Sequence, residues 1–207
     1  MKVFKEKPVT PISLKRRSKI RGIGINDSEY LTSYSEDGVK LMCPYYTAWN
    51  NMFQRCYSPT KKKGYEGCFV CEEWYSFNTF KKWMVTKDWK GNVLDKDLKV
   101  IGNKSYNPST CLFIPPSLNS FIARYDSKGV SYCKRTGSIS KPFIAKVSIG
   151  NRTVNLGHFK TEKEANVRYL QEKSKLITEE ACNHPKEVRE CLINLANEIL
   201  KGAMKCK

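Results

Sequence analysis

The sequence predicts an α+β fold, with a mainly helical N-terminal region followed by a three-stranded antiparallel sheet and a helix. Two observations predict it. Aromatic residues recur at helical spacing in the first half of the chain, and strand-like segments flank a tight turn at Gly150-Asn151-Arg152 in the second. A chain of 207 residues, 40% of them hydrophobic, is long enough for two small cores.

Residues 1–25 predict a basic, flexible arm. This segment holds Pro8, Pro11 and a run of basic residues from Lys15 to Lys19, and it shows little periodicity. We expect it to become ordered only on a partner. Further on, Pro44 and an apolar stripe predict a helix over 45–57, and aromatic residues between 74 and 84 predict a second one.

The next segment predicts two short strands and a helix. Residues 93–100 and 106–114 are separated by a polar turn, and Pro115-Pro116 then opens a short helix through Asn119. With a linker around 124–128, these elements complete an expected domain over residues 26–124.

The C-terminal part shows the clearest local pattern. Strands are expected at 129–132, 143–147 and 153–159, followed by a capping box formed by Thr161 and Glu164 and a helix to residue 177. These elements form an expected domain over 128–177. A last helix starts at Pro185 and occupies most of residues 178–207.

The positive charge is concentrated in two short blocks. Residues 1–25 hold eight basic and one acidic residue, or +7, and residues 120–160 again hold eight and one, or +7. Residues 26–119 hold twelve and ten, or +2, so the excess is not spread over the chain. Two blocks that are almost free of acid indicate a polyanionic partner, and a membrane surface is disfavoured because neither block forms an amphipathic pattern.

The apolar and cysteine patterns disfavour three other classes of protein: membrane proteins, secreted proteins and zinc-binding proteins. No apolar run could span a bilayer, and the N-terminal residues MKVFKEKPVT lack the apolar stretch of a secretion signal, so we expect an intracellular protein without a membrane partner. The pair Cys68 and Cys71 could supply half of a zinc site with Cys43 and Cys56. These last two are too widely spaced for a second tight pair, so free thiols are favoured over Zn²⁺.

The C-terminal sheet region resembles the APETALA2-type DNA-binding domain. The resemblance rests on residues 129–130, 143–145, 156–159 and 161–165. It implies a sheet that lies in the major groove of double-stranded DNA and contacts it through alternate side chains. The residues then expected to contact DNA are Lys134, Arg135, Lys146 and Arg152 in this domain, and Lys15, Arg16 and Arg17 in the arm.

The middle region resembles the HNH, or ββα-metal, nucleases of phage homing endonucleases. Asp95-Lys96 takes the place of the family's Asp-His pair, Asn107 the central position and Asn119 the helical one. The resemblance implies that Asp95 and Asn119 hold Mg²⁺ and that Asn107 orients the group that activates water. Lys96 would be that group or would contact the scissile phosphate.

The missing histidine leaves the enzymatic activity open. Imidazole suits proton transfer near neutral pH, and the two histidines, His158 and His184, lie outside this segment. A Mg²⁺-dependent endonuclease and an inactive descendant that acts as a DNA-binding regulator are therefore both compatible with the sequence. RNA binding through the arm is a third alternative. If the chain is phage-encoded, the host cytoplasm is its expected location. The target sequence and the oligomeric state are not predicted.

Overall fold

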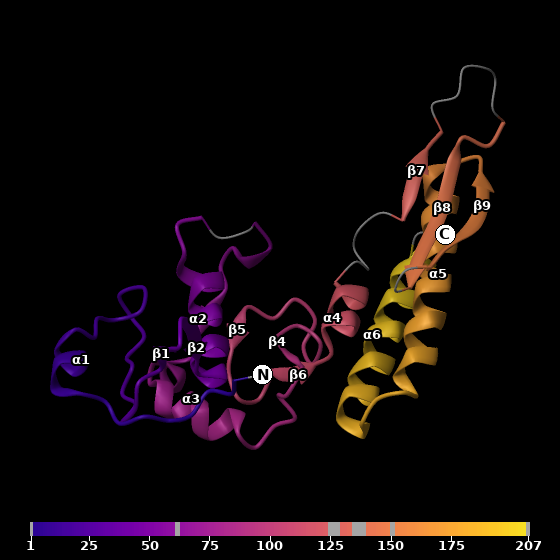
Figure 1. Cartoon of the computed structure of the whole chain (residues 1–207). Helices are drawn as coiled ribbons and strands as arrows, with labels where there is room; N and C mark the ends of the chain where they lie inside the picture. The colour runs from indigo at the N-terminus through magenta and orange to yellow at the C-terminus, as the bar shows by residue number, and fades with distance from the viewer. Residues whose placement is uncertain (1, 61–62, 124–128, 134–139, 150–151, 206–207) are drawn as a thin grey trace. The chain divides into compact units, whose positions relative to one another are not determined.

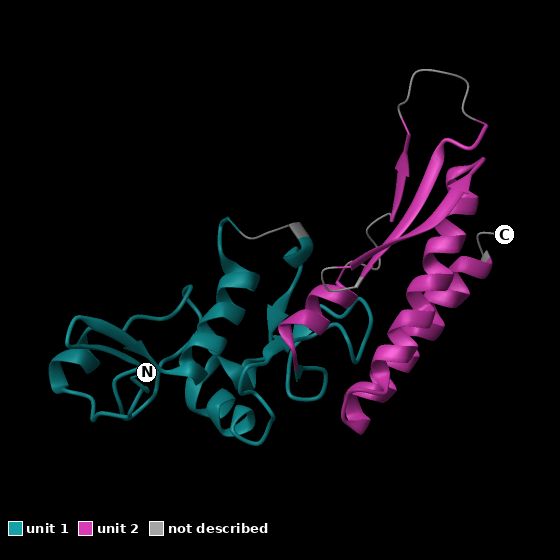
Figure 2. Ribbon diagram, turned by 45° about the vertical axis from the view of Figure 1, so that its right-hand side comes forward, with its two compact units in different colours: residues 1–113 teal, residues 114–207 magenta. Residues whose placement is uncertain are grey.

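The computed structural model describes residues 2–60, 63–123, 129–133, 140–149 and 152–205, and it confirms the α+β fold. The chain divides into two compact units, residues 1–113 and 114–207, which Figure 2 colours separately. This boundary precedes the expected one near residue 124, because α4 (Pro116–Ile122) belongs to the second unit. Lys173 attaches α4 there: its Nζ donates to the Phe121 carbonyl at 2.8 Å and lies 3.7 Å from the centroid of the Phe121 ring.

Unit 1 is organised around an aromatic core between two helices, α2 (Pro44–Tyr57) and α3 (Phe77–Met84) (Figure 1). α2 confirms the helix expected over 45–57. Trp49 lies at the centre, with ring centroids 4.8 Å from Phe53 and 5.6 Å from Phe77. The second helix starts later than expected, because the 3-10 turn η2 (Glu72–Tyr75) comes before it and Ser76 caps its first turn.

The N-terminal segment is packed onto this core rather than free of it, unlike the flexible arm that the sequence predicts. Its short helix α1 (Pro11–Lys15) is capped by Thr10. Phe4, Ile20 and Ile23 contact the aromatic core, and the backbone of residues 7–9 bonds to that of residues 29–31. Half-buried apolar side chains and paired backbone groups thus fix the segment in place.

Small strands complete unit 1. β1 (Ser33–Glu36) and β2 (Val39–Met42) form a hairpin, β3 (Phe69–Val70) pairs in parallel with β5 (Ser105–Tyr106), and β4 (Val93–Asp95) pairs with β6 (Leu112–Ile114). A 3-10 turn, η1, covers Lys63–Tyr65. The two strands expected over 93–100 and 106–114 are therefore shorter than predicted, and they are separated by β5.

Unit 2 contains the predicted antiparallel sheet, in the order β7 (Val130–Tyr132), β8 (Phe143–Ile149) and β9 (Arg152–Phe159). Helix α5 (Glu162–Ala181) packs on the sheet, and α6 (Lys186–Lys205) packs along α5 (Figure 2). The Ser174 hydroxyl donates to the Ala196 carbonyl at 2.8 Å between these two helices. The last helix is thus part of the same unit as the sheet.

Candidate nucleic-acid interface

The sheet of unit 2 turns one face to α5. Ala145 and Val147 of β8 are buried there against Ala165 and Tyr169 of the helix. Side chains alternate along a strand, so the intervening residues of β8 point to the opposite face. We call this opposite face the outer face.

The strand register assigns the rest of the outer face. Ser131 pairs with Ile144, which pairs with His158, and Lys146 pairs with Asn155. Pairing shifts by one residue after Ala145, where Gly157 adopts a φ of 117°. This bulge keeps Asn155 and His158 on one face although they are three positions apart. The outer face therefore comprises Ser131, Ile144, Lys146, Ser148, Thr153, Asn155 and His158.

Ile144 is apolar, but the other six side chains of the outer face are polar, and none of the seven is acidic. Its charged group is the exposed Lys146 ammonium on the central strand. The hydroxyls of Ser148 and Thr153 bond to each other at 2.9 Å, and the Asn155 Oδ1 accepts from the Gly157 N–H at 3.1 Å. Ammonium, amide, hydroxyl and imidazole groups on one surface can donate hydrogen bonds to phosphates and to the acceptors on base edges.

Two local features hold this sheet on its helix. A Cβ at Gly129 would lie 2.1 Å from the Tyr169 ring and 2.7 Å from the Lys146 carbonyl, so only glycine lets the chain enter β7 here. The Gly129 carbonyl in turn accepts from the Lys146 N–H at 2.7 Å. The predicted capping box of α5 is confirmed, with Thr161 Oγ1 accepting from the Glu164 N–H at 3.2 Å.

The expected DNA contacts in the sheet are only partly brought together. Lys146 lies at the centre of the outer face, whereas Arg152 is in phase with Val154 and so belongs to the side of α5, at the exposed start of β9. Lys134 and Arg135 lie outside the described residues. Asn155 and His158 were missed, because strict alternation along β9 does not place both on one face.

The basic residues near α1 fall into two groups. Lys15 and Arg16 are exposed. Arg17 instead donates from Nη1 to the carbonyls of Asn26 at 3.0 Å and Ser28 at 2.6 Å, and from Nη2 to the Tyr30 carbonyl at 3.1 Å. Its guanidinium therefore holds the N-terminal segment to residues 26–30, which differs from the expected contact with DNA.

Asp95 ends β4, as predicted, and its carboxylate caps the turn that follows. Oδ1 accepts from the N–H groups of Asp97 at 2.9 Å and Leu98 at 2.7 Å. Burial raises the pKa of Asp95 above its ordinary value, assisted by the charge of Asp97 and opposed by these backbone bonds and by Lys96. The carboxylate thus has a structural task within its own loop.

Lys96 is buried, with only 4% of its surface exposed. Its ammonium bonds to the Asp97 carboxylate and donates to the Asn103 carbonyl at 2.7 Å. The Asn103 side chain donates back to the Lys96 carbonyl at 2.8 Å. The Lys96 side chain is therefore fixed in a closed hydrogen-bond network.

Asn107 and Asn119, the two asparagines of the expected nuclease site, also lie in the described residues. Asn107 Oδ1 accepts from the N–H groups of Ser109 and Thr110, each at 3.0 Å, so the side chain caps the turn before β6. Asn119 is half-buried on α4 in unit 2, whereas Asp95 lies in unit 1. The two expected metal ligands thus belong to different units.

The hydrogen bonds of these residues use one oxygen of each candidate ligand. The Oδ1 atoms of Asp95 and Asn107 each accept two or more hydrogen bonds, and the Lys96 ammonium is bonded to Asp97 Oδ1, so a Mg²⁺ ion at this loop would have to use the second carboxylate oxygens or displace these bonds. Within the part of the chain that the structure describes, no three His, Cys, Asp or Glu side chains are grouped as metal ligands.

The four cysteines considered for zinc form no disulfide. Cys43, Cys56 and Cys68 are buried, and burial raises the pKa of Cys71 to about 11.

A scan against protein-family models, a search of curated proteins and a search of solved structures each found no match to this chain. Among the helices that the structure places, none combines the length and the apolar character needed to cross a bilayer.

Proposed function

We propose that this chain is a site-specific double-stranded DNA-binding protein whose outer face enters the major groove. One observation carries the proposal: a small sheet, supported from behind by α5, presents a polar, acid-free surface with Lys146 on its central strand. The major groove admits a narrow β-structure and displays acceptors that such groups can read. The net charge of +7 over residues 120–160 supports the proposal, because it favours a polyanion.

We propose further that the protein binds DNA without cutting it, as a regulator built on a nuclease-like scaffold. The support is the hydrogen bonding of Asp95, Lys96 and Asn107, each of which serves the backbone of its own loop. The endonuclease activity that the HNH resemblance implies is tested by incubating the protein with Mg²⁺ and the genomic DNA flanking its own gene. Specific cleavage would overturn this part of the proposal.

The binding itself is tested by salt dependence. A duplex selected from a random pool by the wild-type protein serves as the probe, and its dissociation constant is measured over a range of salt concentrations. Lys146→Ala should weaken binding and reduce the slope of log K against log salt by about one, because one phosphate contact and its released counterion are lost.

Lys175→Ala is the matched control, since this exposed lysine lies on α5 in the same unit and bonds only loosely to Glu179, at 3.8 Å. It should leave both affinity and slope close to wild type. Equal effects of the two substitutions would show that binding follows overall charge and would remove the outer face from the interface.

A further inference from the structure

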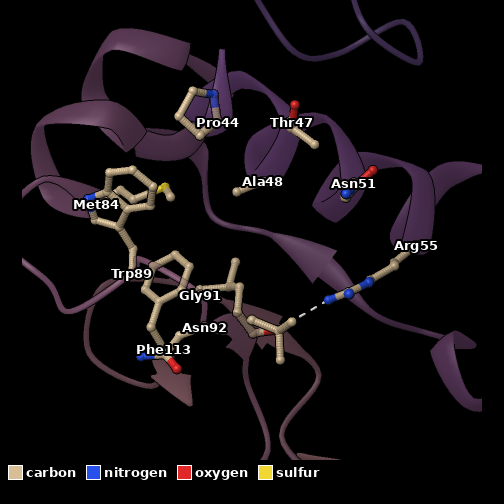
Figure 3. A pocket seen from close by; sticks show the side chains of 12 residues that line it. Pro44, Thr47, Ala48, Asn51, Arg55, Met84, Trp89, Gly91, Asn92 and Phe113 are labelled. Atoms are coloured by element: carbon tan, nitrogen blue, oxygen red, sulfur yellow. Dashed lines mark hydrogen bonds between the residues drawn. The ribbon is translucent and has the colours of Figure 1, made fainter. Parts of the chain in front are cut away.

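Unit 1 contains a pocket that neither the outer face nor the Asp95 loop uses. It has a volume of about 310 Å³ and lies between α2 and the segment that leads into β4 (Figure 3). Small-molecule sites in proteins start at about this size, at roughly 300 Å³. The pocket can therefore accept a single compact ligand.

The walls of the pocket are apolar and aromatic. Pro44 and Ala48 of α2 face the rings of Trp89 and Phe113 across it (Figure 3). The Trp89 ring is held by an edge contact with Tyr45, at a centroid distance of 4.9 Å. Rigid ring surfaces of this kind favour a planar group between them.

The polar part of the pocket lining includes one guanidinium and two side-chain amides. Arg55, Asn51 and Asn92 contribute to it, and the lining includes no acidic side chain. The Arg55 Nη1 donates to the Leu94 carbonyl at 3.2 Å (Figure 3), and its guanidinium lies 5.8 Å from the centroid of the Tyr65 ring. Within the described residues, no carboxylate lies within ion-pair distance of this half-buried guanidinium.

The charge of Arg55 is retained despite its position. Burial alone would lower its pKa, but the charge of Tyr106, a hydrogen bond with its side chain and the charges of Tyr65 and Asp95 together raise it above the ordinary value. A half-buried cation bonded to a carbonyl rather than to a carboxylate gains strongly from an added anion. The pocket therefore combines apolar and aromatic walls with a guanidinium that, among the described residues, forms no ion pair with a carboxylate.

We propose that this pocket binds a small planar anion of nucleotide size, with the ring between the apolar walls and the phosphate at Arg55. The inference stands apart from DNA binding by the outer face, because the pocket lies in unit 1 and the outer face in unit 2. Such a ligand could be a free mononucleotide or a nucleotide within a single strand, since the recognised chemistry is the same.

The test is isothermal titration of the full chain with adenosine 5′-monophosphate. Adenosine and inorganic phosphate should each bind at least about tenfold more weakly, because each lacks one half of the recognised chemistry. Titration with a short 5′-phosphorylated single strand distinguishes the sources: tighter binding than the mononucleotide assigns the site to a strand, and weaker binding assigns it to the free nucleotide.

Two variants locate the site. Arg55→Met should weaken binding of the monophosphate at least about tenfold by removing the cation, and Ala48→Leu should do so by filling the pocket while Arg55 stays in place. Two control variants should bind the monophosphate like the wild type. They are Arg16→Met, at an exposed arginine of the same unit, and Lys146→Ala. No binding of the monophosphate, binding unchanged in both pocket variants, or inorganic phosphate binding as tightly would overturn the proposal.

Discussion

At the scale of single residues, Asp95, Lys96 and Asn107 lie where the sequence predicts, in or beside the short strands of the middle segment. The sequence could predict their positions because strand ends and spacings are visible in it. Their hydrogen bonds could not be predicted, because the acceptors of Lys96 and the donors to Asp95 depend on how the loop after β4 closes. The local fold thus accounts for the hydrogen bonds that Asp95, Lys96 and Asn107 make.

Asp95→Asn tests this structural role through pH. Because the pKa of Asp95 is higher in the folded than in the unfolded protein, its contribution to the free energy of unfolding is greatest at acid pH and falls as the pH rises through its folded pKa. Asparagine keeps an Oδ1 acceptor for Asp97 and Leu98 without the buried charge. We expect a higher melting temperature than wild type at neutral pH and a smaller difference near pH 3.

A lower melting temperature at neutral pH would contradict that account, since it would mean that the folded loop requires the charge. Loss of a Mg²⁺-dependent cleavage activity in the same variant, with unchanged DNA affinity, would instead place Asp95 in an active site.

Gly129 shows a second kind of residue-scale constraint. Gly129→Ala should lower the free energy of unfolding by about 1–3 kcal/mol, because its Cβ would meet the Tyr169 ring and the Lys146 backbone. Chemical denaturation measures this change. Gly202→Ala, in open space within α6, is the control and should stabilise by about 0.5–1 kcal/mol. A neutral Gly129→Ala would mean that β7 does not approach Tyr169 this closely.

At the scale of elements, the helices and the C-terminal hairpin could be predicted because their signals are local. α2, α5 and the pair β8 and β9 follow from periodicity, capping and turn residues. The hairpin of β1 and β2 was missed, although Asp37-Gly38, with φ of 48° and 73°, is a strong turn signal. The bulge in β9 could not be predicted, since it arises from pairing with β8.

The N-terminal segment shows how composition can mislead. Its basic run indicates a free arm, yet Phe4, Ile20 and Ile23 anchor it and Arg17 binds backbone carbonyls. These contacts are made with residues distant in sequence, which periodicity does not detect. We therefore expect deletion of residues 1–21 to lower the melting temperature, unlike the loss of a flexible arm.

Arg16 and Arg17, which are neighbours in the sequence, test whether the N-terminal segment contributes to the stability of the protein. Arg17→Ala should destabilise the protein by about 1–3 kcal/mol, because buried carbonyls lose their donor. Arg16→Ala, at an exposed position, should leave the free energy of unfolding nearly unchanged. Thermal unfolding of both variants gives the comparison, and equal small effects would show that the segment contributes no stability.

At the scale of the whole molecule, the two compact units separate the candidate functions. Unit 2 contains the outer face, and unit 1 contains the Asp95 loop and the Arg55 pocket. Charge placement along the sequence indicated a polyanion, and the alternation in β8 placed Lys146 on the exposed side of the sheet. The position of Asn155 and His158 on the outer face could be seen only once the strand register was known.

The most direct test of the central claim is to map the DNA-bound surface in the full chain. Backbone amide chemical shifts are compared with and without the duplex selected by the wild-type protein. We expect the largest changes at four residues of the outer face, Ser131, Lys146, Asn155 and His158, and little change in the α5 residues around Lys175. Changes confined to α1, α5 or α6, with the outer face unaffected, would contradict it.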